Sequence, residues 1–356
     1  MNDPRHPDGV PAVAIILVNW NGWRDTVECI DSLLLQDHGR FHVFVVDNAS
    51  NDDSITRISA WCAAPASERG WREHDGVLRW SNGPAAGSVA HRIVDRPAGI
   101  LAAPPGDCRV TLIQSGGNLG FAGGCNVAVR AAGLEAFDHF WFLNNDTVVA
   151  RDALSTLVRR ACAPPRPGIT GSTIAFYDAP QVIQVMGGAR MDVTRGIAHH
   201  IGGGVSVDAL PALAGAVEDQ MAFVMGASML VSREFVAQIG MMQEDYFLYF
   251  EEIDWAIRGR GRFSLGYAAA SRVYHKAQAS GRKAVRFSTR FFYRNRIRFA
   301  SRYYPEHLGA TKRGMLSEML RHLARGRWTH VSLIAETLRD AGQIAAEARS
   351  SGQHGG

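Results

Sequence analysis

Hydrophobic positions in the first 150 residues form short continuous runs that alternate with amphipathic stretches. Residues 13–18 are an uninterrupted aliphatic run followed by the turn sequence Asn-Trp-Asn-Gly at 19–22, a pattern typical of a strand buried on both faces. Similar runs lie at 41–46, 109–113 and 140–143, and helical spacing of apolar residues follows each one. Alternation of strands and helices favours a mostly parallel sheet with helices on both faces. We therefore predict an α/β fold.

Polar clusters occupy the carboxyl ends of three predicted strands. Asn19 and Asn21 follow the first run, Asp47 and Asn48 follow the second, and residues 144–146 follow the fourth. In open α/β sheets, ligands bind beyond the carboxyl ends of the strands. Asn, Asp and Gly also end strands that bind no ligand. Each cluster alone is therefore compatible either with a simple turn or with a ligand site. The three clusters together predict a ligand site.

A glycine-rich segment at 116–126 lies between the third predicted strand and the next helix. Glycine lets the backbone approach a ligand closely, and a helix N-terminus favours an anion. The segment has neither the Walker A nor the dinucleotide-binding spacing, so alone it is a weak indication of nucleotide binding.

Two other segments carry carboxylates suited to catalysis. Asp146 directly follows a buried run, where its oxygen atoms suit Mg²⁺ or Mn²⁺; the alternative is that it caps a turn or helix. Glu251, Glu252 and Asp254 follow the aromatic run at 246–250. Adjacent carboxylates in apolar surroundings raise one another's pKa, which prepares a general base. The alternative is an acidic helix start that complements the helix dipole.

Composition and charge narrow the class of protein. The chain has 356 residues, of which 46% are hydrophobic and 20% charged, which excludes global disorder and collagen-like repeats. Its five cysteines form no CxxC pair, so neither a zinc ribbon nor a dithiol site is predicted. The longest apolar stretch falls well short of the roughly 20 residues of a membrane span. Residues 1–11 show no signal-peptide pattern.

Positive charge is concentrated near the C-terminus. The net charge is +4, yet residues 282–327 carry 13 Lys and Arg against two Glu. Arginines recur there at four-residue spacing with aromatic residues between them, which gives a basic stripe on a helix. The stripe comprises Arg282, Arg286, Arg290, Arg294, Arg298 and Arg302. It predicts either a helix on an anionic membrane surface or a helix that packs its aromatic residues on the catalytic domain.

The order of these motifs resembles that of family 2 glycosyltransferases with the GT-A fold, most closely bacterial rhamnosyltransferase-type enzymes. The resemblance covers roughly residues 12–305 and rests on six motifs: Asn19-Trp20-Asn21, Asp47-Asn48-Ala49-Ser50, the glycine-rich segment, Asn144-Asn145-Asp146, Gly226-Ala227-Ser228 and Glu251-Glu252-Ile253-Asp254-Trp255. It implies a Rossmann-like, mostly parallel central sheet with flanking helices and a C-terminal helical extension. It also implies inverting, metal-dependent transfer of a sugar from a nucleotide-sugar donor to an acceptor hydroxyl.

The resemblance also implies roles for individual residues. The donor would contact Asn19, Asn21, Asp47, Asn48, Asn118, Gly120, Asn126 and Asn145. Asp146 and His275 would hold Mg²⁺ or Mn²⁺, and Glu252 would be the base, with Glu251 and Asp254 as alternatives. The acceptor or a membrane would contact Trp255, Arg258, Arg290 and Arg294. The chain departs from the family pattern twice, because Asn144 replaces the first acid of the Asp-x-Asp motif and Glu252 stands where Asp is more usual.

These patterns divide the chain into four parts. We expect an N-terminal tail (1–11), a catalytic domain (12–280) with an insertion at 62–108, basic amphipathic helices (281–349) and a disordered tail (350–356). The expected reaction transfers rhamnose from dTDP-rhamnose to a saccharide or polyprenyl-diphosphate-linked acceptor during cell-surface polysaccharide synthesis. The enzyme would be cytoplasmic and peripheral on the inner face of the plasma membrane, without a nucleic-acid partner and with self-association left open. The alternatives are a UDP-dependent hexosyl or galactofuranosyl transferase and a non-catalytic scaffold.

Overall fold

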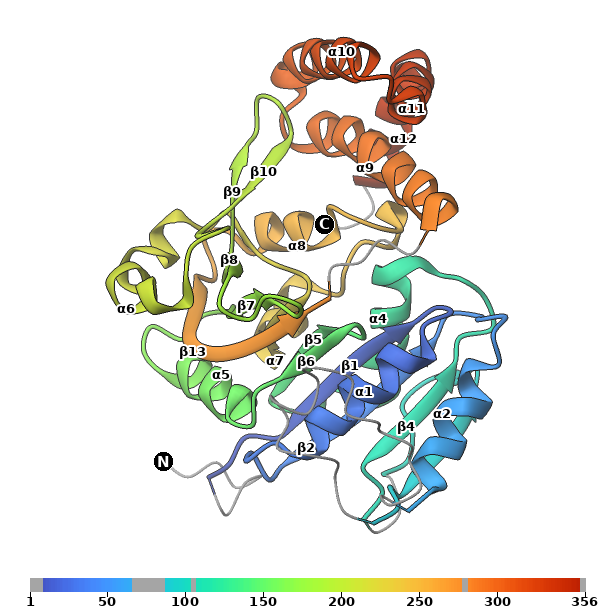
Figure 1. Ribbon diagram of the computed structural model, residues 1–356, viewed down its shortest axis with the longest axis vertical. Helices are drawn as coiled ribbons and strands as arrows, with labels where there is room; N and C mark the ends of the chain where they lie inside the picture. The colour runs from blue at the N-terminus through green and yellow to red at the C-terminus, as the bar shows by residue number, and fades with distance from the viewer. Residues whose placement is uncertain (1–8, 66–86, 104–106, 277–280, 353–356) are drawn as a thin grey trace.

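A mostly parallel sheet forms the centre of the molecule (Figure 1). The computed structural model describes residues 9–65, 87–103, 107–276 and 281–352. In these residues the sheet has ten strands in the order β3-β4-β2-β1-β5-β12-β7-β13-β6, and β8 pairs with β7 outside this order. The strands are β1 (Val13–Asn19), β2 (Phe41–Asp47), β3 (His91–Asp95), β4 (Val110–Gln114), β5 (His139–Asn144), β6 (Thr147–Val149), β7 (Ile169–Phe176), β8 (Ile183–Met186), β12 (Ser228–Ser232) and β13 (Leu265–His275). The predicted α/β class is confirmed.

Strand β1 is central because its side chains are apolar on both faces. Val13, Ile15 and Leu17 belong to one hydrophobic cluster, whereas Ala14 and Ile16 belong to the other, as expected for side chains that alternate across a sheet. The first cluster includes residues of α1 (Trp23–Leu34), α2 (Ser54–Ala63) and α5 (Ala153–Cys162). The second includes residues of α4 (Gly120–Ala132), α7 (Arg233–Ile239) and α8 (Glu251–Gly259). Helices therefore cover both faces of the sheet.

The parallel register brings the polar strand ends together. Strand β1 pairs with β2 so that Asn19 lies opposite Asp47, and it pairs with β5 so that Val18 lies opposite Asn144. Since all three strands run in the same direction, their carboxyl ends form one edge of the sheet.

A second, three-stranded sheet has the order β10-β9-β11 and lies above the central sheet in Figure 1. It comprises β9 (Gly188–Asp192), β10 (Ile197–His200) and β11 (Phe223–Val224), and the short helix α6 (Leu210–Leu213) lies between β10 and β11 in the chain. The turn between β9 and β10 reaches the C-terminal helices, because the backbone oxygens of Thr194 and Arg195 accept hydrogen bonds from Thr311 and Arg296.

Four helices form the C-terminal extension (Figure 1). They are α9 (Gly281–Tyr303), α10 (Leu308–Ala324), α11 (Trp328–Arg339) and α12 (Ala341–Gly352). These helices share a hydrophobic cluster that includes Ile297, Met315 and Ile334. Helix α9 also joins the catalytic domain, since Phe299 packs with Phe250 in a separate cluster. Across the described ranges, none of the helices combines the length and the apolar character needed to cross a bilayer.

Two parts of the chain differ from the expected boundaries. The predicted insertion at 62–108 contains β3, which pairs in parallel with β4 at the edge of the sheet. The sequence pattern missed this strand because it is only partly buried, with Ile93 47% exposed. At the other end, α12 continues to Gly352, so residues 350–352 of the predicted disordered tail are helical. Residues 1–8 and 353–356 of the predicted tails lie outside the described residues.

Candidate active site

A hydrogen-bonded network joins the carboxyl ends of β1 and β2. Asn19 donates from Nδ2 to Asp47 Oδ1 at 2.7 Å, and the Ser50 hydroxyl donates to the same oxygen at 2.5 Å. The Ser50 backbone N–H donates to Asp47 Oδ2 at 3.0 Å. The Asn21 backbone N–H in turn donates to Ser50 Oγ at 2.8 Å. The network therefore fixes Asp47 and the turn that contains Asn21 in one arrangement.

The same network continues to the end of β5. Thr26 of α1 donates to Asn19 Oδ1 at 2.9 Å, and Asn145 Nδ2 donates to Thr26 Oγ1 at 2.9 Å. Four of the predicted donor-binding residues, namely Asn19, Asn21, Asp47 and Asn145, thus lie in one connected region.

The glycine-rich segment contacts this region through Asn48. Its Nδ2 donates to the Gly120 carbonyl at 2.8 Å, and Asn118 Oδ1 accepts from the Gly120 N–H at 3.1 Å. Gly120 has a φ of +72°, and a Cβ there would lie 2.2 Å from the Phe247 carbonyl oxygen, so this position requires glycine. Part of the glycine pattern therefore serves contact with the segment before α8.

Asn126 is bonded outside this hydrogen-bonded network. Its side chain is buried, donates to the Met242 carbonyl at 2.9 Å and to Glu244 at 2.9 Å, and accepts from the Met242 N–H at 3.2 Å. Both of its N–H groups are thus used inside the protein. These bonds favour a structural role for Asn126 over the predicted contact with a donor, and the sequence pattern does not show which asparagines are already bonded to distant backbone.

Asp146 and His275 lie together beside the end of β5. His275 Nε2 is 3.2 Å from Asp146 Oδ1 and 3.3 Å from Asn144 Nδ2. The other ring nitrogen, Nδ1, is 2.8 Å from Gln184 Oε1. Since that oxygen only accepts, Nδ1 carries a hydrogen, and Nε2 is the ring nitrogen that faces Asp146 and Asn144. The end of β13 is fixed next to this pair, because Lys276 donates to Glu28 at 2.5 Å.

The chemistry of this pair fits a divalent cation. One imidazole nitrogen and one carboxylate oxygen are ligands that Mn²⁺ accepts, and a hydrogen bond to the second ring nitrogen commonly orients a ligating histidine. Groups of three or more His, Cys, Asp or Glu side chains suited to a metal are absent from the described part of the chain. The protein therefore offers two such ligands here, with the neutral amide of Asn144 beside them.

Glu251 and Glu252 begin α8 directly after a strained segment, which we call the base loop (Tyr246–Phe250). Three aromatic residues of this loop, Phe247, Tyr249 and Phe250, have φ values of 64°, 69° and 78°. Left-handed conformations of bulky residues are costly and persist where the surroundings enforce them, often at functional sites. The loop thus holds the start of α8 in a defined position.

The two glutamates differ in their surroundings. Glu251 is 4% exposed, and burial together with the neighbouring Glu252 charge raises its pKa well above the ordinary value. Glu252 is half-buried, and burial raises its pKa to about 7. Its Oε2 atom is buried without a hydrogen-bond partner among the described residues. Glu251 Oε2 also has no partner among the described residues, so the two glutamates differ in exposure, and Glu252 is the one that is partly exposed.

The segment Gly226–Ala227 connects Glu252 to the Asp146 region. A Cβ on Gly226 would lie 3.6 Å from Glu252 Oε1, and the Ala227 carbonyl accepts from the Asn144 N–H at 3.1 Å. Gly226 thus lies beside Glu252, and the adjacent Ala227 bonds to Asn144 at the end of β5. Glu252 and the end of β5 lie on the same side of the molecule.

Three other residues predicted for this region have structural roles. Asp254 is fully buried and accepts from Arg258 at 2.7 Å and from Tyr303 at 2.6 Å. Arg258 also donates to two backbone carbonyls. Trp255 is 1% exposed and donates from Nε1 to the Gly240 carbonyl at 2.8 Å. Burial and bonding of these groups in the core therefore favour structural roles over the predicted ones, which were an alternative base for Asp254 and contact with acceptor or membrane for Trp255 and Arg258.

The arginine stripe of α9 is largely paired within the protein. Arg290 lies 2.8 Å from Glu336, Arg294 lies 3.9 Å from Glu347, and Arg302 lies 2.6 Å from Asp245. Several aromatic residues between them pack inward, as where Phe291 stacks on Phe247 with ring centroids 4.6 Å apart. The second interpretation of the stripe, packing on the catalytic domain, is the one observed. Arg290 and Arg294, predicted to contact acceptor or membrane, each have an acidic partner within the protein.

Asn295 of α9 is a site residue that the sequence pattern missed. It is buried, and its Nδ2 lies 2.8 Å from the Tyr246 carbonyl oxygen and 2.9 Å from those of Leu248 and Tyr249. One amide group thus holds three carbonyls of the base loop. The only signal in the sequence is a short neutral amide within a strongly basic helix.

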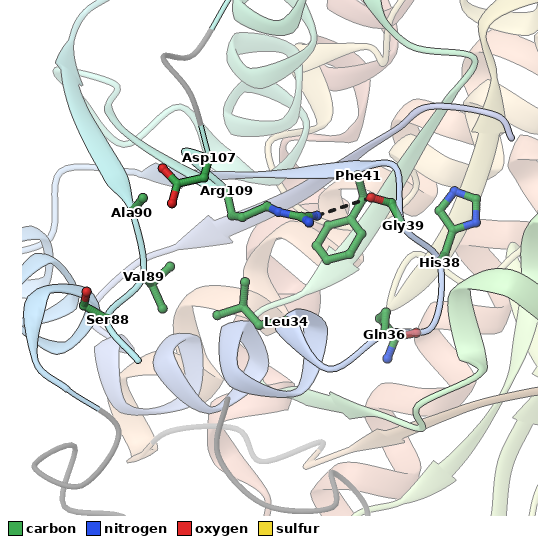
Figure 2. A pocket seen from close by; sticks show the side chains of 10 residues that line it. All are labelled: Leu34, Gln36, His38, Gly39, Phe41, Ser88, Val89, Ala90, Asp107 and Arg109. Carbon is green, nitrogen blue, oxygen red and sulfur yellow. Dashed lines mark hydrogen bonds between the residues drawn. The ribbon is translucent and has the colours of Figure 1, made fainter. Parts of the chain in front are cut away.

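Figure 2 shows a cavity of about 300 Å³ at the opposite end of the strands. Its lining includes Leu34 at the end of α1, Phe41 at the start of β2, and Arg109, which donates to the Gly39 carbonyl at 3.4 Å. The cavity is therefore separate from the polar strand ends and includes none of the predicted site residues.

Comparison with known proteins identifies the family. Residues 14–74 and 96–240, more than half of the chain, match Glycosyl transferase family 2. Curated proteins give no match. Similar solved structures include the mannosyltransferase PcManGT from Pyrobaculum calidifontis in complex with GDP-Man and Mn²⁺ (TM-score 0.50, 14% identity, covering 96% of this chain and 87% of that chain). Another is S. aureus TarS 1–349 (TM-score 0.42, 12% identity, covering 95% and 88%). At these identities the likeness concerns the fold alone. The chain belongs to glycosyltransferase family 2 and has the GT-A fold.

Proposed function

We propose that this protein is an inverting, metal-dependent glycosyltransferase that uses a nucleotide-sugar donor. One observation carries the proposal: Gly226–Ala227 lies between Glu252 and Asn144, and Asn144 lies beside the Asp146–His275 pair, at the edge of the sheet that also holds Asp47. A base, a candidate cation site and a polar nucleoside region are the three parts that this reaction requires.

The nucleoside part of the donor binds at the ends of β1 and β2. Asp47 Oδ2 accepts one hydrogen bond, from the Ser50 N–H, and a carboxylate oxygen has room for a second donor such as a base N–H. Asn21, Asn48, Asn118, Gly120 and Asn145 border this place. The hydrogen bonds of the network hold these groups ready before the donor arrives, which reduces the entropy lost on binding.

Asp146 and His275 are the residues that would hold Mg²⁺ or Mn²⁺. A divalent cation bound here would neutralise negative charge that develops on the departing diphosphate. Because Asn144 is neutral, this end of the sheet carries less negative charge than a pair of acids would provide. We therefore expect modest affinity for the metal in the absence of donor, with the diphosphate supplying further oxygen ligands.

Glu252 acts on the acceptor. The acceptor hydroxyl oxygen forms a bond to the anomeric carbon while the bond from that carbon to the diphosphate oxygen breaks, and the hydroxyl proton passes to Glu252. Attack opposite the leaving group inverts the anomeric configuration. A pKa of about 7 suits this task, because a general base works best when its pKa lies near the working pH, and such bases contribute roughly 10²–10⁴ in rate.

For the donor we propose dTDP-rhamnose, and for the acceptor a saccharide or polyprenyl-diphosphate-linked saccharide in cell-surface polysaccharide synthesis at the inner face of the plasma membrane. The order of the six motifs supports this assignment. UDP-hexose and UDP-galactofuranose remain the alternatives for the same site.

Transfer assays with a panel of dTDP-, UDP- and GDP-sugars, Mn²⁺ and saccharide acceptors test the proposal. We expect product with one donor class, an anomeric configuration opposite to that of the donor, and a fall in kcat of at least about 10² in Glu252→Gln. Glu251→Gln is the matched control and should retain far more activity. Transfer and donor hydrolysis that are both undetectable in the wild type would leave a non-catalytic scaffold, and equal activity of Glu252→Gln and wild type would remove the assigned base.

A further inference from the structure

The end of α10 and the start of α11 form a corner that exposes large apolar side chains. We call it the α10–α11 corner and define it by Leu316, Leu320, Arg321, Leu323, Arg325, Arg327 and Trp328. Trp328 is 67% exposed and Leu320 62% exposed, and Leu316 and Leu323 are each 44% exposed. The three leucines follow four- and three-residue spacing and share one face of α10. Such a concentration of exposed apolar area indicates an interaction surface.

The charge of the corner has a single sign. No Asp or Glu occurs between Met319 and Ala335, and Arg321, Arg325 and Arg327 are exposed. Within the described ranges none of these three arginines has an ion pair. The flanking acids are used elsewhere, since Glu318 lies 2.7 Å from the buried Arg296 and Glu336 lies 2.8 Å from Arg290. The corner therefore presents positive charge that the protein itself does not neutralise.

A hollow of about 370 Å³ extends the corner toward α9. Arg286, Trp328 and Ser332 are among its lining residues. The next residue of α9, Phe287, is 38% exposed, and its ring lies 5.9 Å from that of Trp20 in the turn after β1. The surface thus continues from the corner to the rim of the candidate donor site.

We propose that the α10–α11 corner docks the protein on an anionic lipid bilayer. Tryptophan is favoured at the bilayer interface, leucines enter the acyl boundary, and arginines contact lipid phosphates while their stems remain in apolar surroundings. A second copy of this chain fits less well, because two identical corners would bring six arginines together without a carboxylate between them. Nucleic acid offers phosphates but leaves the exposed leucines without apolar partners.

Docking on a bilayer also gives a reason for the continuous surface between the α10–α11 corner and the rim of the candidate active site. This reason rests on the proposed function. A lipid-linked acceptor lies at the same interface that the corner would occupy. Contact through α10, α11 and the start of α9 would hold the rim near Trp20 next to that interface. The arginines that contact lipid are then those of the corner, rather than Arg290 and Arg294.

Vesicle co-sedimentation of the full chain tests the proposal. We expect retention on phosphatidylcholine vesicles that contain phosphatidylglycerol, little retention on phosphatidylcholine alone, and weaker retention as salt rises. Each arginine near an anionic surface changes binding about fivefold, so the variant Arg321→Gln/Arg325→Gln/Arg327→Gln should lose roughly 100-fold in vesicle affinity. Trp328→Ser/Leu320→Ser should also lose retention, without loss of positive charge.

A matched control removes three exposed arginines of the catalytic domain: Arg159→Gln/Arg260→Gln/Arg262→Gln. It has the same net charge as the corner variant and should keep its retention on anionic vesicles. Equal losses in the two triple variants, or no retention of the wild type, would overturn the proposal. Two other results would also overturn the proposal by assigning the corner to another partner. One is self-association of the wild type that Leu320→Ser abolishes. The other is tighter retention of the protein on RNA than on vesicles.

Activity measurements separate this proposal from the proposed function. Transfer to a water-soluble saccharide should be unchanged in the corner variant, because none of its three positions belongs to the active site. Transfer to a lipid-linked acceptor in vesicles should fall. Vesicle retention that depends on the corner, in a protein that transfers no sugar, would support docking and refute the enzyme assignment.

Discussion

Replacing Glu252 by glutamine should stabilise the unliganded protein at alkaline pH while removing its activity. Glu252 Oε2 is buried without a hydrogen-bond partner among the described residues, and burial raises the pKa from an ordinary value of 4.5 to about 7. An ionised carboxylate in this position is therefore unfavourable. Glutamine keeps the size and shape of the side chain but cannot ionise.

The sign and size of the effect follow from the difference in proton binding. Between about pH 4.5 and 7 the unfolded chain loses the Glu252 proton while the folded chain keeps it, so rising pH favours unfolding and stability falls. At about 1.4 kcal/mol for each unit of pKa, the full difference corresponds to about 3 kcal/mol. Partial exposure of Glu252 reduces this to about 2 kcal/mol. With an unfolding entropy of about 2.1 cal/mol/K per residue, 2 kcal/mol raises Tm by about 3 °C.

Thermal unfolding followed by circular dichroism, in chelator and without donor, measures this difference. At a pH near 4.5, the ordinary pKa of the carboxyl group, Glu252→Gln and the wild type should have similar Tm values. Well above pH 7, the Tm of Glu252→Gln should be about 3 °C higher than that of the wild type. Glu306→Gln, at an exposed position, is the control and should show no such trend. A variant that is less stable than the wild type at high pH, or a difference independent of pH, would refute the reasoning.

Four further variants test residues that hold the candidate site in place. Asn295→Leu should lower kcat with little change in donor KM and destabilise the fold by about 2–4 kcal/mol, because three carbonyls of the base loop lose their partner; kinetics and urea unfolding measure the two effects, and unchanged kcat would contradict a positioning role. Gly120→Ala should destabilise the protein by more than about 1 kcal/mol, since its Cβ would meet a carbonyl of the base loop and its φ is positive. The matched control Gly117→Ala has no atom within 4 Å of the added Cβ and should be nearly neutral in the same unfolding assay. His275→Ala should raise the Mn²⁺ concentration needed for half-maximal activity, and Gln184→Leu should raise it by about 10-fold or more through the orientation of the ring; no change in either metal titration would exclude this pair as the cation site.

Local patterns in the sequence determined the α/β class and the parallel half of the sheet. Residues 13–18 are apolar throughout. A strand buries all of these side chains only when both faces of the sheet are covered, so the pattern predicted a central strand. The polar residues that end β1, β2 and β5 predicted where a ligand site would form, because parallel strands bring equivalent ends to one edge. That Asn19, Asp47 and residues 144–146 lie at one edge of the sheet could be predicted to this extent without coordinates.

Roles that depend on burial were decided only by the tertiary structure. Glu252 and Asp254 stand two residues apart in one acidic motif, yet packing leaves the first half-buried with a free oxygen and closes the second in a cluster with Arg258 and Tyr303. Asn295 holds the base loop from 46 to 49 residues away along the chain. The free energy of a charged or polar side chain depends on which distant groups fold against it, and a periodic pattern does not contain that information.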